Sequence, residues 1–457
     1  MYKKLLKNIS FITIGTLASK LVVYFMIPLY TAVLTTEEYG SIDLIFTTSS
    51  LIMPVLSIEI SNAVMRYLLD EKYNENKVIF NCLIILLVSV ITFIITSLFL
   101  ININIFKEFY FYFCIYYLSN LFNGFLQCIV RGKNYVKVYS FAGIIQTIST
   151  VFFNILFLLK FDFKIKGYLM AYSLGAIISF VYLFVIIINN RVIKFNHTSY
   201  DKKLMKEMME YSIPLVPNSL LWWISNSSDK YMLTYFTELS TIGIYSVAYK
   251  IPTILSILSS IFISAWQISS VEDFGSEKNM KFFNNITNKY LYLTILLTSF
   301  ILVILKPLCK LMFSNDFYNA WRVIPILLIG YVYYNMSIFL GTIYTASKKT
   351  KMVLISTVIG SVINILFNFI LIPYLNMYGA ALATTVSYIL IYIIRKIDSK
   401  KIMILNLNNR DTIYGIILLI QSIMIYNNCF IVNLICFSVI LLIPLKKHIL
   451  KLGKRDL

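Results

Sequence analysis

Long stretches without a charged residue constrain this chain more than any other feature. Five of them exceed the ~20 residues that an α-helix needs to cross about 30 Å of hydrocarbon: 78–106, 109–130, 138–159, 167–190 and 323–347. A sixth, 352–394, is too long for one helix, and Pro373, Asn376 and Gly379 near its centre predict a tight turn between two helices. With 59% hydrophobic and 13% charged residues, the chain lies outside the usual range of soluble proteins. We predict a polytopic membrane protein.

The remaining apolar segments carry a few charges or are short. Adding segments near 9–34, 40–65, 211–236, 242–267 and 290–305, and dividing 412–445 at Asn427-Asn428, gives fourteen spans. The thirteenth, 412–426, is only about 22 Å long at 1.5 Å per residue, so it must thin the bilayer locally or begin earlier. The predicted fold class is therefore all-α, with about 14 transmembrane helices.

The distribution of lysine and arginine supports this count. With the N-terminus in the cytoplasm, 30 of the 40 basic residues fall on the cytoplasmic side, seven lie in external loops, and Lys20, Lys230 and Lys250 lie within spans. This asymmetry follows the positive-inside rule and places both termini in the cytoplasm. The net charge of +19 is thus mostly a matter of topology. It does not indicate nucleic-acid binding, which would require the bases on one folded face.

Two sets of similar motifs indicate an internal duplication. Phe153-Asn154 and the Gly-x-x-x-Ala motif at 167–171 recur as Phe367-Asn368 and 379–383, and the segment 34–40 resembles 236–243. Each half holds six spans, so both halves enter from the same side, as in transporters whose parallel repeats enclose a central cavity. We predict an N-lobe at 1–205, a C-lobe at 206–396, and an appendix at 397–457 with spans 13 and 14 and a basic tail.

Lys20 is the charged residue placed deepest in the predicted hydrocarbon. It lies ~16 Å from the nearer end of its span, farther than a lysine side chain can reach to the interface. Thr13, Thr16 and Tyr24 share its helix face and extend a polar stripe. Because a buried charge in a membrane usually faces protein or water, we expect Lys20 and Tyr24 to line the cavity. The alternative is a lysine that pairs with a carboxylate for helix packing.

Lys250 and the tryptophans of span 7 are weaker candidates for the cavity. Lys250 lies ~12 Å deep beside a polar stripe that includes Tyr249, so a functional role and partial snorkelling both remain open. Most of the 34 tyrosines must serve as interfacial anchors or packing. The remaining substrate-binding candidates are Trp222, Trp223 and Asn226.

Three acidic residues lie closest to the hydrocarbon: Asp43, Glu59 and Asp229. Each is a candidate to take up a proton, to bind a coupling cation or to neutralise Lys20. Lys230 follows Asp229 directly, but sequence neighbours on a helix point about 100° apart and need not pair. Arg66 and Arg131 end spans 2 and 4 at the cytoplasmic face. They are candidates for a cytoplasmic gate or for anchoring to lipid phosphates.

Several motifs are missing from the sequence. The six cysteines show no CxxC spacing and the two histidines stand alone, so neither a metal site nor a disulfide framework is expected. The chain contains no P-loop, no dinucleotide-binding fingerprint and no HExxH. We therefore expect no cofactor, and transport driven by an ion or substrate gradient. The longest loops have roughly 20 residues and face the cytoplasm, which argues against an enzyme with an external catalytic loop.

The chain resembles the polysaccharide-transporter family, the Wzx-type flippases of O-antigen and capsule repeat units in the multidrug/oligosaccharidyl-lipid/polysaccharide superfamily. The resemblance covers essentially the whole chain. It rests on five short sequence motifs, which occur in the same order and in the same predicted spans as in that family: Pro28-Leu-Tyr-Thr, Leu34-Thr-Thr-Glu-Glu-Tyr-Gly40, Tyr211-Ser-Ile-Pro-Leu-Val-Pro217, Ser228-Asp-Lys-Tyr-Met232 and Gly243-Ile-Tyr-Ser-Val-Ala-Tyr-Lys-Ile-Pro252.

The resemblance implies a bacterial inner-membrane protein that moves an undecaprenyl-diphosphate-linked oligosaccharide to the outer leaflet. It also implies that cationic residues of spans 1 and 8 hold the pyrophosphate, and Lys20 and Lys250 stand in those spans. Relatives often carry arginine there, whereas lysine offers a point charge instead of a bidentate fork. Possible partners are membrane lipids, a coupling H⁺ or Na⁺, a polysaccharide polymerase and a chain-length regulator.

Two rival functions remain open from the sequence. An ion-coupled exporter of drugs or small molecules would share the fold but would favour an acidic cavity, against which Lys20 argues. A membrane polysaccharide polymerase or ligase would need a substantial outward loop with catalytic basic residues, and the predicted topology has none.

Overall fold

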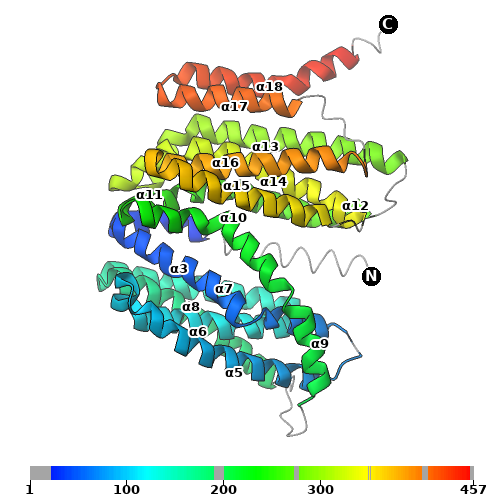
Figure 1. Ribbon diagram of the computed structural model, residues 1–457. Helices are drawn as coiled ribbons and strands as arrows, with labels where there is room; N and C mark the ends of the chain where they lie inside the picture. Colours follow the sequence, from blue (N-terminus) through cyan, green and yellow to red (C-terminus); the bar gives the residue numbers. More distant parts are fainter. Residues whose placement is uncertain are drawn as a thin grey trace. The chain divides into compact units, whose positions relative to one another are not determined.

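The computed structural model describes residues 22–70, 72–189, 200–271, 277–347, 349, 351–403 and 410–452. Every regular element in these ranges is a helix (Figure 1). Ten of the helices described are long and apolar enough to cross a membrane, and they coincide with the predicted spans 2–6 and 8–12. The all-α polytopic fold is therefore confirmed.

The other predicted spans are shorter or more polar. Shorter apolar helical segments occur at Val22–Val33, Thr412–Tyr426 and Phe430–Leu442, so span 1 is described only from residue 22 onward. Span 7 is α10 (Leu215–Phe236), which carries Asp229 and Lys230. Span 13 is α17 (Arg410–Tyr426), which begins two residues before the apolar run and has 17 residues. At 1.5 Å per residue it reaches about 25 Å.

The chain divides into two compact units, residues 1–227 and 228–457, with the boundary inside α10. In the first unit, α8 packs against α6 and α7, and α4 packs against α5, α6 and α9. Its elements are α2 (Ile27–Val33), α3 (Thr36–Leu56), α4 (Ile60–Leu68), α5 (Glu75–Leu100), α6 (Asn104–Gly132), α7 (Val136–Ile155), the π-helix η1 (Leu156–Lys160), α8 (Lys164–Asn189), α9 (Lys202–Ser212) and the first part of α10.

In the second unit, α16 packs against both α14 and α15, while α17 and α18 pack against each other and against α13 (Figure 1). Its elements are the last part of α10, α11 (Leu239–Ala248), α12 (Lys250–Val271), α13 (Glu277–Met312), the 3₁₀-helix η2 (Asn315–Arg322), α14 (Ile324–Ala346), α15 (Lys351–Leu375), α16 (Met377–Ser399), α17 and α18 (Phe430–Leu452). The boundaries of the N-lobe, the C-lobe and the appendix stay predictions.

The duplicated motifs occupy similar places in two helical hairpins, α7–α8 in the first unit and α15–α16 in the second. Asn154 and Asn368 are both fully buried. Gly167 and Gly379 lie near the starts of α8 and α16, where a Cβ would come within 2.9 Å of Phe157 Cβ and 2.5 Å of the Leu371 carbonyl oxygen, respectively. Only glycine lets the backbones approach this closely at either hairpin.

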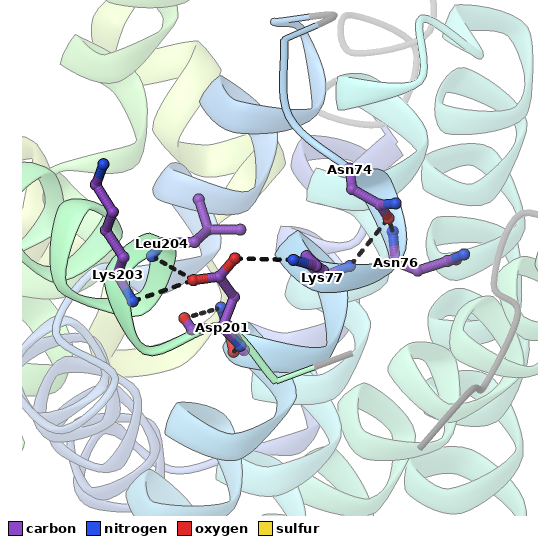
Figure 2. A network of polar contacts seen from close by, with 7 residues as sticks. Asn74, Asn76, Lys77, Asp201, Lys203 and Leu204 are labelled. Atoms are coloured by element: carbon purple, nitrogen blue, oxygen red, sulfur yellow. Dashed lines mark hydrogen bonds and ion pairs between the residues drawn. The ribbon is translucent and has the colours of Figure 1, made fainter. Parts of the chain in front are cut away.

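The start of α9 is fixed to α5 through Asp201 (Figure 2). The Asn81 amide donates to the Asp201 carbonyl at 2.9 Å and accepts from the Asp201 N–H at 3.2 Å. Asp201 also caps α9, because Oδ1 accepts from the N–H groups of Lys203 and Leu204, while Lys77 Nζ donates to Oδ2 at 3.0 Å. These bonds hold the pKa of the Asp201 carboxyl below its usual value, with the Lys77 bond as the largest cause. The linker helix α9 is thus part of the first unit.

Candidate functional site

Span 2 is broken near one of the predicted acidic residues. Helix α3 ends at Leu56, α4 begins at Ile60, and Ile58 and Glu59 between them both have φ of 53°. A β-branched residue in the left-handed region is costly, and such strain often marks functional sites. The Glu59 carboxylate accepts hydrogen bonds from the Asn62 amide at 2.7 Å and from the Ser219 hydroxyl. The break thus places an acidic group against the first part of α10.

The same part of α10 carries the two tryptophans. The Trp223 indole N–H donates to the Thr47 carbonyl of α3 at 3.0 Å. The Asn226 amide donates to the Trp222 carbonyl one turn earlier, at 2.7 Å. Trp222 itself is 37% exposed. Trp223 therefore joins α10 to α3, whereas the Trp222 ring remains accessible as a stacking surface.

Asp229 is a buried carboxylate of the second unit, with an exposed fraction of 2%. Its Oδ2 accepts hydrogen bonds from the hydroxyls of Tyr245 and Tyr249, each at 2.8 Å. The Thr384 hydroxyl lies 3.4 Å from the same oxygen. Oδ1 accepts from the backbone N–H of Lys230 at 2.9 Å. The structure therefore brings Asp229 and Tyr249, two separate candidates from spans 7 and 8, into direct contact.

A second layer of polar side chains supports this cluster. Asn364 donates to Thr384 Oγ1 at 3.3 Å, and its own Oδ1 accepts from Ser228 at 3.1 Å and from Asn368 at 3.0 Å. Asn364, Asn368 and Thr384 are all buried. Asn368 Oδ1 is buried without a hydrogen-bond partner in the described part of the chain.

The cluster of Asp229, Tyr245, Tyr249, Asn364 and Thr384, which we call the Asp229 cluster, is rich in oxygen. Hard cations prefer oxygen ligands, and the carboxylate, three hydroxyls and an amide could supply them if the tyrosine hydroxyls turn. Among the described residues, no three histidine, cysteine or acidic side chains converge as metal ligands do. A single carboxylate suits a proton or a monovalent cation better than a divalent metal.

The predicted cationic site is described only in part. Lys20 lies outside the described residues, and Tyr24, near their start, is half-buried. Lys250 is the first residue of α12, directly after the turn at Tyr249, and is half-buried. Lys230 is also half-buried, in α10. The contact of Lys20 and Lys250 with a pyrophosphate stays a prediction.

Three further candidates lie in the first unit. Asp43 is half-buried on α3. Arg66, on α4, is exposed and pairs with Asp70, two residues beyond the end of that helix, at 3.7 Å. The Arg131 guanidinium lies 5.1 Å from the centre of the Tyr139 ring, a cation–π contact. Gate or lipid-anchoring roles for the two arginines remain predictions.

Comparison with known proteins identifies the family. The sequence model of the family "Polysaccharide biosynthesis protein" matches residues 5–267, more than half of the chain. The chain belongs to the polysaccharide biosynthesis protein family. A second family, MatE, matches residues 214–370. The capsular polysaccharide biosynthesis protein CapF of Staphylococcus aureus is 23% identical over 403 residues, 84% of this chain and 96% of CapF.

A second relative of this member of the polysaccharide biosynthesis protein family comes from Methanocaldococcus jannaschii. The uncharacterized membrane protein MJ1068 is 23% identical over 288 residues, which span 61% of this chain and 56% of MJ1068. The match thus covers little more than half of that relative.

Solved structures share the fold of this polysaccharide biosynthesis protein family member. The lipid II flippase MurJ, in an inward closed conformation, has a TM-score of 0.74 at 16% identity, over 96% of this chain and 99% of its own. An inward-facing multidrug resistance MATE family transporter of the MOP superfamily has a TM-score of 0.68 at 14% identity, over 85% of this chain and 97% of its own. The resemblance to the polysaccharide transporters is confirmed.

Sequence reasoning missed three members of the Asp229 cluster. Tyr245 lies one helical turn before Tyr249, and Asn364 lies one turn before Asn368 of the repeated motif, so both had a neighbour at helical spacing. Thr384 had no such signal. It lies 155 residues from Asp229, and only the packing of α16 brings it there.

Proposed function

We propose that this polysaccharide biosynthesis protein is a flippase for a lipid-linked oligosaccharide. It would move an undecaprenyl-diphosphate-linked repeat unit from the cytoplasmic to the outer leaflet of a bacterial inner membrane, by alternating access, for O-antigen, capsule or exopolysaccharide assembly. One observation carries the proposal. The chain matches a polysaccharide biosynthesis family and also shares its fold, over 96% of its length, with a lipid II flippase.

The chemistry of this substrate fits the candidate residues. A diphosphate with several sugars cannot cross hydrocarbon unaided, so it needs a wet path with fixed positive charge and surfaces for the sugars. Lys20 and Lys250 are the proposed contacts of the diphosphate, and the accessible ring of Trp222 is a candidate for stacking on a sugar. The hydroxyl of Tyr249 is already engaged by Asp229, which favours a role at the carboxylate over one at the sugar.

We further propose that the Asp229 cluster binds the coupling ion, a proton or Na⁺. A carboxylate buried within a membrane protein is costly and usually serves ion movement. Its side-chain partners are hydroxyls from α11, from α16 and from the turn at Tyr249, and the Asn364 amide of α15 donates to one of them, Thr384. These neutral groups can stabilise either a bound cation or the protonated acid. Uptake of the ion would change the charge of the second unit, which is what a coupled transport step requires.

The test of the flippase proposal uses a strain that depends on this gene for its surface polysaccharide. Deletion should make the oligosaccharide-lipid accumulate on the inner leaflet, where it can be extracted and identified. In complementation, Lys20→Ala should abolish surface polysaccharide and Lys20→Arg should retain it. Lys107→Ala, which removes an exposed lysine near the start of α6, serves as the matched control. Normal polysaccharide with Lys20→Ala would remove the proposed role of that lysine, and no accumulated lipid after deletion would remove the flippase.

An ion-coupled multidrug exporter is the second candidate, because the MatE family matches residues 214–370 and a multidrug transporter shares the fold. Cationic drugs would need an accessible acid, whereas Asp229 is buried beneath two tyrosines. Susceptibility to cationic drugs discriminates between the two functions. A deletion strain that becomes drug-sensitive but keeps its polysaccharide would favour the exporter.

A further inference from the structure

A buried arginine lies near the C-terminus of α16. There α16 packs against α14 and against the N-terminal part of α15. Arg395 is only 3% exposed. Its Nε donates to Ser356 Oγ at 2.9 Å, and Nη2 donates to Thr357 Oγ1 at 3.0 Å and to the Val353 carbonyl at 3.2 Å, all on α15. Its Nη1 donates to the Ser337 carbonyl on α14 at 2.8 Å. One side chain thus binds both neighbouring helices.

The acceptors show what this arginine does. All four are neutral hydroxyl or carbonyl oxygens, so the guanidinium is held by geometry and not by an ion pair with any of them. Taking a charged group out of water is costly. An apolar side chain would fill the space between the helices at a lower cost, so the arginine must contribute more than volume. Arginine carries five donors in a rigid plane, whereas a lysine ammonium is a single point that cannot reach two helices in this way.

The three helices are packed closely enough for such a clamp. A Cβ on Gly341 of α14 would lie 3.4 Å from Arg395 Nη1, so the glycine leaves room for the guanidinium. Elsewhere along α16, a Cβ on Gly330 would come within 2.7 Å of Thr385 Oγ1, and one on Gly360 within 2.4 Å of Ile391. Helix α16 therefore sits in grooves on both α14 and α15.

The backbone of Arg395 is fixed as well. The Tyr344 hydroxyl of α14 lies 3.2 Å from the Arg395 carbonyl and 3.1 Å from Asp398 Oδ2. Asp398 in turn pairs with Lys401 at 2.9 Å. Both the main chain and the side chain of this turn of α16 are thereby tied to its neighbours.

We propose that Arg395 is a positioning residue for the Asp229 cluster. Two members of that cluster, Asn364 on α15 and Thr384 on α16, belong to the helices that Arg395 joins. Arg395 lies eleven residues beyond Thr384 and Ser356 lies eight before Asn364, which is about 16 Å and 12 Å along the helices. Arg395 therefore acts on the cluster through the spacing of α15 and α16. This inference rests on the proposed ion-binding role of Asp229.

The test compares Arg395→Met and Arg395→Lys with Lys400→Met, which removes an exposed charge from the same helix end. Transport in proteoliposomes is measured against Na⁺ concentration and pH. Both Arg395 variants should raise the cation concentration for half-maximal transport about tenfold, as loss of supporting residues does at metal sites, and lysine should not rescue. Wild-type cation dependence in Arg395→Met, with only the amount of protein reduced, would overturn the proposal and leave a purely structural role.

A second pair of measurements guards against misfolding and against failure of the ion site itself. If Arg395→Met does not accumulate, the double variant Ser356→Ala/Thr357→Val keeps the arginine and should show the same shift in cation dependence; no shift would overturn the proposal. Hydrogen exchange of backbone amides at 353–364 and 384–395 should accelerate in the Arg395 variants. Unchanged exchange would overturn the clamp, whereas unchanged cation dependence in Asp229→Asn would overturn the ion site alone.

Discussion

At the residue scale, the central feature is a carboxylate whose partners come from three helices, α10, α11 and α16, and from the turn at Tyr249. Asp229 and Tyr249 stood out in the sequence because each is polar within an apolar span. Their pairing could not be predicted, since periodicity describes one helix at a time and says nothing about which helices meet. The same limit hid Thr384, which is an ordinary polar residue of α16 until packing places it beside the carboxylate.

Replacing Asp229 with asparagine tests this carboxylate directly. The amide has the same shape but cannot hold a proton or a negative charge, so Asp229→Asn should leave the folded protein in place while ion-coupled transport falls about tenfold or more. Tyr249→Phe should have a smaller effect, because Tyr245 still donates to Oδ2. Transport assays and protein levels are measured together. Asp316→Asn, an exposed acid at the start of η2, is the control, and full transport in Asp229→Asn would contradict the coupling role.

At the element scale, helix ends and hairpins explain most of the local structure. The motif Thr35-Thr-Glu-Glu38 forms a capping box: Glu38 N–H donates to Thr35 Oγ1 at 3.1 Å and Thr35 N–H donates to Glu38 Oε2 at 2.8 Å. This start of α3 could be predicted from the sequence. The break at Ile58-Glu59 could not, because neither residue is a glycine or a proline and the nearest proline, Pro54, lies inside α3.

The turn between α15 and α16 should depend on Gly379. A methyl group there would lie 2.5 Å from a backbone oxygen, which cannot move as a side chain can, so Gly379→Ala should destabilise the protein by about 1–3 kcal/mol. Gly124→Ala is the matched control, since a Cβ at that position in α6 would meet nothing within 4 Å. Thermal unfolding in detergent measures both. Equal melting temperatures for the two variants would contradict the proposed close approach.

The anchoring of α9 should depend on pH. The pKa of Asp201 is lowered in the folded protein, chiefly by its hydrogen bond with Lys77. Such a group contributes stability above its unfolded pKa of about 3.9, and this contribution is lost as the pH falls through the folded pKa. The melting temperature of Asp201→Asn should therefore lie below that of the wild type at pH 7, and the difference should shrink toward pH 3.

Lys77→Gln provides the control for this prediction, because it removes the other partner of the same ion pair. The difference in melting temperature between Lys77→Gln and the wild type should also become smaller as the pH falls. A difference between wild type and Asp201→Asn that stays constant from pH 7 to pH 3 would mean that the carboxylate charge does not hold the linker.

At the scale of the whole molecule, the sequence predicted the membrane fold well and the functional geometry poorly. Uncharged runs located spans 2–6 and 8–12 because length and hydropathy alone define them. The repeated motifs could be recognised because Gly167 and Gly379 both permit a close approach within a helical hairpin. Arg395, by contrast, directly follows the uncharged run 352–394, which gave no sign of burial, and only the structure shows that it is buried between helices.

The proposed role of the Asp229 cluster leads to a prediction about the energy source of transport. With the driving force in an ion gradient, an imposed Na⁺ or proton gradient should accelerate lipid-linked oligosaccharide transport in proteoliposomes that contain no nucleotide. Ionophores that collapse the gradient should return the rate to its basal value. Nucleotide-dependent transport that ignores both gradients would contradict ion coupling.

The close hairpins α7–α8 and α15–α16 also bear on how such a chain is made. Each brings together helices that follow one another directly, so its contacts need no segment synthesised later. Contacts between sequence neighbours form fastest because little chain entropy is lost in closing a short loop. We therefore expect each of the two hairpins to form early, before the helices that are synthesised after it.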